Sequence, residues 1–350
     1  MTIEWLQQQV AEINTQSFAA AQQRQNTLTK PPGSLGRLEQ LAMTLAAMQG
    51  KQKPGIDKVH ISVFAADHGI AEEGVSAFPQ AVTVEMIRNF SRGGAAICVL
   101  AKQLGAQLEV INLGTVLEHE DLPQVRVQAI APGTANFSQQ AAMSDSQLAE
   151  ALQVGADAAI RAQQYAAQLF IGGDMGIANT TSATAVASAL LEMPAEQLAG
   201  PGTGLDAAGI KHKAEVINKA IERHRPEMTS ALSILRHLGG FEIAALTGAY
   251  IQCAQQGTCI LVDGYIATVA VLIAVKLNPE VKQWMLFAHA SAEPGHKKLL
   301  AALAVEPILD LSMRLGEGSG AAVAVPVLQL ACQLHNSMAT FAEAGVSNKE

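Results

Sequence analysis

The segment 314–320 (RLGEGSG) places one carboxylate, that of Glu317, between two glycines. Three glycines in five residues supply no apolar contact and cost chain entropy, so they indicate that a ligand or another backbone comes close to the chain here. A carboxylate in such a place could accept a proton or stabilise a positive charge. A solvated glutamate at a helix start explains the same residues, because its charge suits the helix dipole. The segment alone slightly favours this second interpretation.

Two further glycine-rich segments have the composition of an anion site. Residues 171–182 (IGGDMGIANTTS) join closely spaced glycines to Asn, Thr and Ser, and residues 200–206 (GPGTGLD) are followed by Lys213. Backbone N–H groups, hydroxyls and one ammonium group suit a phosphomonoester. The pattern is neither a Walker A sequence nor GxGxxG. An ordinary turn capped by Thr180 or Thr181, with Lys213 as a solvated helix charge, is the alternative.

Two polar side chains follow predicted strands farther along the chain. Asp263 ends the segment 259–263, and Ser291 follows the segment 284–289. Strand ends in a parallel sheet face the ligand crevice, so we expect the acid to bind sugar hydroxyls and the serine to bind a ligand oxygen. A nucleophilic triad of Ser291, His289 and Asp263 is a second interpretation, which no GxSxG segment supports.

Asp67 and His68 stand at the end of another predicted strand. A catalytic pair or a set of metal ligands would use these side-chain types. We favour a structural role for His68, because no second histidine or cysteine lies at ligand spacing nearby. Asp67 is either a functional acid or a cap for buried backbone N–H groups.

These residues need a scaffold that brings strand ends together. Nearly continuous apolar runs that end in a polar residue or glycine are typical of strands buried on both faces of a parallel sheet. The Ala-rich segments between them are long enough for crossover helices, so we predict a doubly wound α/β fold with a mainly parallel six-stranded sheet. The predicted strands are 58–66, 108–113, 125–130, 169–173, 259–263 and 284–289, and the predicted crossover helices are 84–104, 145–167, 183–191 and 213–223.

Both ends of the chain are predicted to be helical and to pack together as a small lobe. The chain is helical again from Ser312 onward. Residues 1 to about 50 are mostly polar apart from an apolar stripe of Leu38, Leu41, Leu45 and Met48. We therefore assign residues 1–50 and 301–350 to a small helical domain and residues 51–300 to a large catalytic α/β domain.

Composition limits the classes of function. The 350 residues are 49% hydrophobic and 15% charged, which describes a well-buried globular enzyme. A net charge of -8, without a long basic run, argues against nucleic acid and anionic membrane as partners. The first residues have no basic n-region or apolar h-region, and no window reaches the ~18 apolar residues of a membrane span, so we expect a cytoplasmic protein. The four cysteines lack CxxC spacing and are predicted to be small core residues, and we expect no metal and no cofactor.

Six segments together resemble the nicotinate-nucleotide:dimethylbenzimidazole phosphoribosyltransferase family. They occur in order over nearly the whole chain, and the first and last are long and specific. The segments are 30–39 (KPPGSLGRLE), 66–69 (ADHG), 173–181 (GDMGIANTT), 239–242 (GGFE), 262–265 (VDGY) and 314–320 (RLGEGSG).

The resemblance implies transfer of phosphoribose from nicotinate mononucleotide to 5,6-dimethylbenzimidazole. The products would be nicotinate and α-ribazole 5′-phosphate, for the lower ligand of cobalamin. The leaving pyridinium is already cationic, so its departure neutralises it and needs neither a general acid nor a metal. The resemblance also implies a homodimer with a Rossmann-like sheet and a small helical domain made from both chain ends.

The resemblance reverses the preferred interpretation of Glu317. An attacking benzimidazole nitrogen becomes cationic unless the N–H on its other nitrogen loses its proton, and Glu317 matches the family position of the base that accepts this proton. Inversion at C1′ would explain an α-linked product from a β-nucleotide. The resemblance also assigns residues to the two substrates. Those for the nucleotide and its phosphate are Asp174, Gly176, Gly202, Gly204, Lys213, Asp263, Ser291 and Arg314, and those for the base pocket are Phe78, Thr83, Met86 and Leu315.

Two alternatives stay open. One is a phosphoribosyltransferase that acts on another heterocyclic base, against which the long matching segments argue. The other is a non-catalytic nucleotide-binding protein that has kept the fold. Glu317 argues against this second alternative, since binding a base needs no acid between glycines.

Overall fold

A six-stranded sheet forms the centre of the protein, and every neighbouring pair of its strands is parallel. The computed structural model describes residues 3–347. The strands are β1 Val59–Ala66, β2 Gln107–Gly114, β3 Val125–Val127, β4 Leu169–Met175, β5 Cys259–Val262 and β6 Met285–Phe287. Across the sheet they stand in the order β3-β2-β1-β4-β5-β6. The predicted α/β class with a parallel six-stranded sheet is confirmed.

The central strands β1 and β4 determine where a ligand crevice can form at the carboxyl edge of the sheet. All eight residues of β1 are buried, as its largely apolar sequence predicts for a strand covered on both faces. The connections run to one half of the sheet from β1 and to the other half from β4, so the carboxyl ends of this pair flank a crevice. Asp67 directly follows β1, and Asp174 lies at the end of β4.

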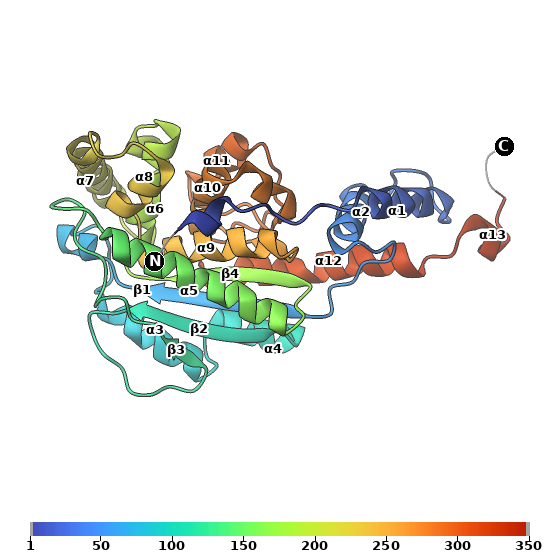
Figure 1. The fold of residues 1–350 in the computed structure, drawn as a ribbon, viewed down its shortest axis with the longest axis horizontal. Helices are drawn as coiled ribbons and strands as arrows, with labels where there is room; N and C mark the ends of the chain where they lie inside the picture. The colour runs from blue at the N-terminus through green and yellow to red at the C-terminus, as the bar shows by residue number, and fades with distance from the viewer. Residues whose placement is uncertain (1–2, 348–350) are drawn as a thin grey trace.

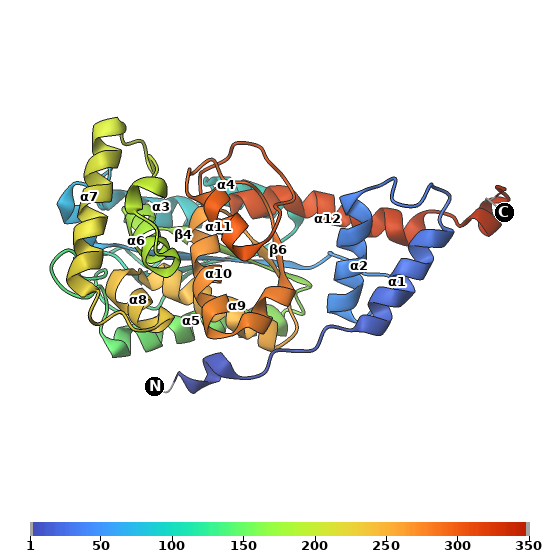
Figure 2. The same cartoon turned by 90° about the horizontal axis from the view of Figure 1, so that it is seen from above.

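Helices cover both faces of the sheet. Figure 2 shows α3, α4 and α12 on one side and α5 and α9 on the other. The helices are α1 Thr15–Thr27, α2 Arg37–Gln49, α3 Ala81–Ser91, α4 Ala96–Leu104, α5 Asp145–Gln164, α6 Asn179–Leu191, α7 Ala207–His224, α8 Ala231–Leu238, α9 Phe241–Gln255, α10 Tyr265–Leu277, α11 His296–Leu303, α12 Ser319–Ser337 and α13 Phe341–Ala344, with the 3-10 helices η1 Glu4–Gln7, η2 Gly69–Glu73, η3 Ala195–Gln197 and η4 Pro279–Trp284.

Three differences from the predicted helices concern segments near the strand ends and the Glu317 loop. The segment 84–104 forms two helices, α3 and α4, because the chain bends at Gly93, whose φ is 77°. Helix α12 begins at Ser319 rather than Ser312, because residues 316–318 have left-handed backbone conformations. Neither Thr180 nor Thr181 caps α6, since the residue before its first turn is Ala178, itself left-handed. The capped-turn interpretation of this loop was therefore wrong.

The two ends of the chain lie side by side in a helical lobe formed by α1, α2 and the C-terminal half of α12 (Figure 1). Arg24 on α1 donates hydrogen bonds to the carbonyls of His335, Asn336 and Met338. The first described residues instead follow α9, where Gln255 donates to the carbonyl of Trp5. The predicted division at residues 50 and 300 stays a prediction, and residues 1–2 and 348–350 of its outer segments lie outside the described residues.

Two predictions from composition can be compared with the fold. All four cysteines are free and buried, as predicted for small core residues. Within residues 3–347, no helix combines the length and the apolar character needed to cross a membrane.

Candidate active site

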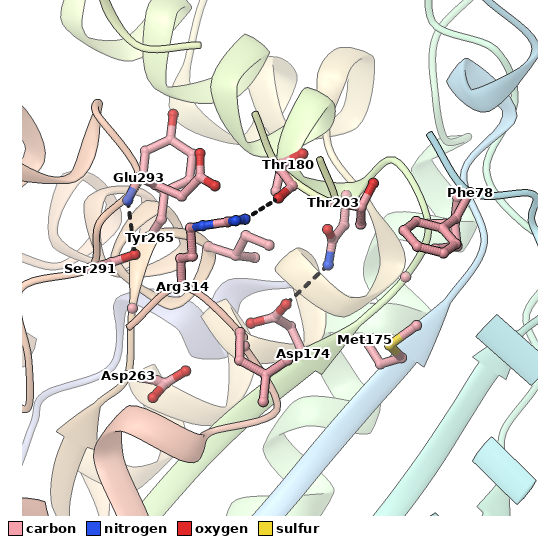
Figure 3. Close-up of a pocket in the computed structure, with 18 of the residues that line it drawn as sticks. Phe78, Asp174, Met175, Thr180, Thr203, Asp263, Tyr265, Ser291, Glu293 and Arg314 are labelled. Atoms are coloured by element: carbon pink, nitrogen blue, oxygen red, sulfur yellow. Dashed lines mark hydrogen bonds between the residues drawn. The ribbon is translucent and has the colours of Figure 1, made fainter. Parts of the chain in front are cut away.

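A cavity of about 310 Å³ lies where β4, β5 and β6 end. Figure 3 shows Ser291, Glu293 and Arg314 towards one end of this cavity and Phe78 and Met175 towards the other. Eight of the residues predicted from the sequence line it, although they come from segments far apart in the chain. These are Phe78, Asp174, Gly176, Gly202, Asp263, Ser291, Arg314 and Leu315.

Glu317 has an unusual backbone conformation beside this cavity. Its φ is 64°, between Gly316 at 91° and Gly318 at 80°, so three successive residues are left-handed. The Glu317 N–H donates to the carbonyl of Asp174 at 3.1 Å. A Cβ on Gly173 would lie 2.4 Å from the carbonyl carbon of Glu317, so β4 comes this close only because residue 173 has no side chain. Gly173 on β4 and the glycines beside Glu317 therefore allow the backbone of β4 and the backbone of segment 316–318 to come into contact.

The Glu317 carboxylate is buried next to a helix N-terminus. The residue is 4% exposed, and its Oε2 accepts a hydrogen bond of 3.2 Å from the backbone N–H of Ile97 in the first turn of α4. Burial raises the pKa of Glu317, and this N–H opposes the rise. Glu317 does not itself line the cavity, whereas its neighbours Leu315 and Gly316 do. The solvated-glutamate interpretation of this residue was wrong, because the side chain is buried.

Two further acids, Asp174 and Asp263, line the cavity. Burial, together with the charges of Asp263 and Glu242, holds the pKa of Asp174 well above its ordinary value. Asp174 Oδ2 accepts a 3.0 Å hydrogen bond from the side chain of Asn179. Asp263 Oδ1 accepts a 2.7 Å hydrogen bond from the N–H of Ala321, which ties β5 to the start of α12. This wall of the cavity favours a ligand that carries or develops positive charge.

The other end of the cavity is lined by Arg314, Thr180 and Gly202, while Lys213 lies behind Thr180 and does not itself line the cavity. Lys213 on α7 is fully buried, and its Nζ donates to Thr180 Oγ1 at 2.7 Å. Burial lowers the pKa of Lys213 to about 8. Gly202 packs on this pair, because a Cβ there would lie 2.7 Å from Thr180 Oγ1. The solvated-charge interpretation of Lys213 was wrong, and the ammonium group reaches the cavity through Thr180.

A loop over this end is fastened to the segment that carries Glu317. Arg314 Nη1 donates to the carbonyl of Gly202 at 2.8 Å. On the other side, the hydroxyls of Thr203 and Ser76 lie 3.2 Å apart. Gly204 does not line the cavity, and its φ of 124° suits a glycine in the turn that leads into α7.

Ser291, His289 and Asp263 do not form a nucleophilic triad. The backbone N–H of Ser291 donates to His296 Nδ1 at 2.7 Å, and the Ser291 hydroxyl accepts from the N–H of Glu293. His289 Nε2 lies 3.8 Å from Asp263 Oδ1, beyond hydrogen-bond distance. Ser291 therefore belongs to a turn that lines the cavity, as the strand-end argument predicts.

The residues assigned to the base pocket divide into two kinds. Phe78 and Leu315 line the cavity and remain half exposed, at 50% and 60%. Thr83 is buried, and its hydroxyl accepts from the N–H of Ile177, so it holds the β4–α6 loop. Met86 is half-buried on the next turn of α3. Only the first pair lines the cavity directly.

Comparison with known proteins shows similarity to phosphoribosyltransferases over nearly the whole chain. A family model described as phosphoribosyltransferase matches residues 10–346. A nicotinate-nucleotide–dimethylbenzimidazole phosphoribosyltransferase of Pseudomonas putida (strain W619) is 57% identical over 349 residues, which cover 100% of this chain and 99% of the relative. The chain belongs to the nicotinate-nucleotide:dimethylbenzimidazole phosphoribosyltransferase family. The enzyme of that name from Pseudomonas aeruginosa (strain PAO1) is 56% identical over the same length.

Solved structures of this family have the same fold. The crystal structure of the enzyme from Thermus thermophilus has a TM-score of 0.91 and 41% sequence identity. It covers 96% of this chain and 100% of its own chain. A second crystal structure from the same organism agrees, with a TM-score of 0.91 and 42% identity. The roles of individual residues in the phosphoribosyltransferase site stay predictions.

Asp67 and His68, which belong to one of the family-like segments, have structural partners. His68 is fully buried between Ser182 Oγ at 3.0 Å and Glu242 Oε1 at 2.9 Å. Asp67 Oδ2 accepts from the N–H of Val116 at 2.9 Å. The structure thus supports the capping role for Asp67 and the packing role for His68. Across residues 3–347, no group of three or more His, Cys, Asp or Glu side chains could hold a metal ion.

Sequence reasoning missed one acid in the phosphoribosyltransferase cavity. Glu293 lines it beside Ser291 and is 5% exposed. Its spacing of two residues from Ser291, just after the last strand, was a usable signal. From the sequence alone, Glu293 resembles an ordinary polar residue of a surface turn. Its burial depends on the distant loop around Gly200, which the sequence does not place beside it.

Proposed function

We propose that the protein transfers phosphoribose from nicotinate mononucleotide to 5,6-dimethylbenzimidazole. The products are nicotinate and α-ribazole 5′-phosphate, which supplies the lower ligand of cobalamin. Relatives that match the full chain at 56–58% identity carry this nucleotide and this base in their names. The observation that carries the proposal is the buried carboxylate of Glu317, held by a left-handed backbone beside the cavity.

In this proposal, Glu317 accepts the proton that the attacking base must lose. One benzimidazole nitrogen attacks C1′ of the ribose, and the second nitrogen carries the N–H. Transfer of this proton to Glu317 prevents a net positive charge on the product base. Burial raises the pKa of Glu317 above that of an exposed glutamate, which makes it a stronger base, and the Ile97 N–H keeps the carboxylate oriented.

The leaving group is nicotinate, whose ring nitrogen becomes neutral when its bond to C1′ breaks. The reaction therefore needs no acid to protonate the leaving group. Positive charge develops at C1′ while the bond to the pyridinium breaks. Asp174 and Asp263 line the cavity, and in their ionised form they stabilise this charge. Attack from the face opposite the leaving group inverts C1′ and converts a β-nucleotide into an α-linked product.

The phosphate of the nucleotide is proposed to bind at the cationic end of the cavity. Lys213, through its contact with Thr180, and Arg314 supply the positive charge. Gly202 and Gly176 bring the backbone close to the ligand, and Ser291 contributes its hydroxyl. Anchoring the phosphate fixes C1′ between the leaving nicotinate ring and the attacking benzimidazole ring. This positioning brings the reacting atoms together for phosphoribose transfer.

Nicotinate release tests the function. The purified protein is incubated with nicotinate mononucleotide alone and with a panel of benzimidazoles, purines and phenols. We expect release that depends on added base and is fastest with 5,6-dimethylbenzimidazole. Faster transfer to a purine would favour the alternative heterocycle, and tight nucleotide binding without release would favour the non-catalytic protein.

We also propose that the protein is a homodimer located in the cytoplasm, acting on small molecules and not on nucleic acid or membranes. The expected mass of the dimer is roughly twice the 36.6 kDa of one chain. Light scattering after size-exclusion chromatography measures this mass directly. A monomeric mass at micromolar concentration would contradict the dimer.

A further inference from the structure

A second buried acid, Glu293, stands at the cationic end of the cavity. It lines the cavity near Arg314 and Ser291 (Figure 3). The residue is 5% exposed, and its Oε2 has no hydrogen-bond partner among residues 3–347. Burying a carboxylate oxygen without a hydrogen bond costs stability, so a functional use explains its position better than a structural one.

The surrounding backbone holds the Glu293 carboxylate in place. Its N–H donates to the Ser291 hydroxyl at 3.3 Å, and its carbonyl accepts from the N–H of His296 at 3.0 Å. A Cβ on Gly200 would lie only 2.1 Å from Glu293 Oε2, so the loop packs directly on the carboxylate. The carboxylate therefore cannot turn away from the phosphate end without moving this loop.

Charged and titratable groups face Glu293 from several elements. Burial raises the pKa of Glu293, while the charges of Lys213 on α7 and Arg314 before α12 and a hydrogen bond from the Gly202 backbone oppose the rise. Tyr265 on α10 faces it as well, and burial raises the pKa of that phenol, which stays neutral. His296 on α11 is neutral too, because burial lowers its pKa to about 3. At this end, one acid thus interacts with two cations, Arg314 in the cavity lining and Lys213 behind Thr180.

Binding of a phosphate dianion would leave this end of the cavity with more negative than positive charges. A phosphomonoester has a second pKa of about 6 and is mostly a dianion at pH 7. With Glu293 ionised, three negative charges would face Lys213 and Arg314. Two like-charged oxyanions at close range in a buried site raise each other's proton affinity. One added proton restores the balance of two negative and two positive charges.

We propose that Glu293 shares one proton with the phosphate of the bound nucleotide, so that the subsite binds a phosphomonoester together with one proton from solution. This inference rests on the proposed function, since it takes the nucleotide as ligand. The proton forms one O–H···O hydrogen bond between a carboxyl oxygen and a phosphate oxygen. No other bond forms or breaks. The subsite therefore loses affinity for the nucleotide as the pH rises through neutrality.

Proton uptake measured by titration calorimetry tests this inference. Nicotinate mononucleotide is titrated into the protein at pH 7 in two buffers of different ionisation enthalpy. We expect uptake of about one proton per nucleotide by the wild type and a value near zero for Glu293→Gln, whose amide N–H can donate to the phosphate without a proton from solution. Lys213, with a pKa of about 8, is already mostly protonated at this pH and adds only about a tenth of a proton.

Three comparisons isolate the role of Glu293. Nicotinate riboside, which lacks the phosphate, should bind without uptake. Glu150→Gln, an exposed substitution on α5, should behave like the wild type. Glu293→Asp should keep the uptake but bind the nucleotide more weakly, which shows that an acid rather than a particular packing is required.

The outcomes separate this inference from the proposed function. Nucleotide binding by the wild type without proton uptake overturns the inference alone. Equal uptake by the wild type and a folded Glu293→Gln variant overturns it as well. A folded wild type that does not bind the nucleotide in either buffer contradicts the proposed function, and this inference with it.

Discussion

Glu317 holds a left-handed backbone conformation that costs a residue with a Cβ about 1–2 kcal/mol. Glycine occupies both neighbouring positions and would fit the same backbone without this cost. Strain of this kind persists where surrounding contacts enforce it, and it gathers at functional sites. Here the carbonyl of Asp174 and the close approach of Gly173 enforce it. The strain therefore supports a role for this carboxylate beyond stability.

Replacing Glu317 by glutamine removes the proposed base but keeps the shape of the side chain. The amide oxygen can still accept from the Ile97 N–H, so the fold and nucleotide binding should be retained. We expect turnover to fall on the order of 10²-fold or more, as for a lost general base. Steady-state nicotinate release and calorimetry measure the two properties. A variant that turns over like the wild type would show that Glu317 is not the base.

Replacing Lys213 by alanine should weaken nucleotide binding more than base binding. A charge-assisted hydrogen bond contributes about 1.5–3 kcal/mol, so we expect the nucleotide dissociation constant to rise roughly ten- to a hundredfold. Because burial lowers the pKa of Lys213 to about 8, the wild type should also lose affinity above pH 8 as the ammonium group loses its proton. Lys211→Ala, an exposed change on the same helix, is the control. Unchanged nucleotide affinity in Lys213→Ala would remove this residue from the phosphate site.

At the residue scale, sequence reasoning worked where a motif and a strand end coincided. Asp263 and Ser291 are predicted at the cavity because each follows or ends a parallel strand, and Asp174, which the family resemblance assigns, lines the same cavity. The burial of Lys213 was not predictable, since a lysine on a helix is usually solvated. Glu293 was missed because its surroundings come from a loop about ninety residues earlier in the sequence.

At the element scale, most of the strands were predictable because buried parallel strands have nearly continuous apolar sequences, whereas β3 (VRV) is short and mostly exposed. Helices α9 and α10 were not assigned from the sequence. Almost every residue of both is buried, so neither shows the apolar stripe of a surface helix. The break between α3 and α4 depends on Gly93, whose left-handed backbone a helical periodicity does not reveal.

Helices α5 and α9 meet backbone to backbone through glycines, which gives a test of the scaffold. A Cβ on Gly248 would lie 2.0 Å from the carbonyl oxygen of Leu152, and one on Gly155 would lie 1.8 Å from that of Ala245. Gly248→Ala should therefore force the helices apart and destabilise the protein by about 1–3 kcal/mol. Urea unfolding measures the change. A variant as stable as the wild type would mean that the helices separate without loss.

A buried carboxylate on β2 predicts how stability depends on acid. Glu109 accepts hydrogen bonds from Ser62 on β1, Arg126 on β3 and Arg161 on α5. Although burial acts in the opposite direction, hydrogen bonds from His60 and Arg161 lower the pKa of Glu109 from 4.5 to about 2. The folded state thus binds fewer protons than the unfolded state between these values, so the stabilisation is present above pH 4.5 and is lost as the pH falls towards 2.

The difference between these pKa values corresponds to at most about 3 kcal/mol. Urea unfolding at pH 6 and pH 3 should show a loss of stability in the wild type that is smaller in Glu109→Gln. The variant should also be less stable than the wild type at pH 6, because two arginines lose a charged partner. Parallel losses in both proteins would show that other carboxylates control the acid dependence.

At the scale of the whole molecule, α12 joins the cavity to the helical lobe. It begins directly after the Glu317 segment and runs along the body into the lobe (Figure 1). Gln329 donates to the carbonyl of Ile56, and Asn336 donates to that of Pro54. One helix thus supports both the proposed base and the lobe. The predicted boundary at residue 301 stays a prediction.

The most direct test of the account is the identity of the product formed from nicotinate mononucleotide and 5,6-dimethylbenzimidazole. Proton NMR of the reaction follows both rings and the anomeric proton at C1′. We predict equal amounts of nicotinate and of a benzimidazole ribotide with an α linkage. A β-linked ribotide, or a folded protein that binds the nucleotide but releases no nicotinate when the base is added, would contradict the account.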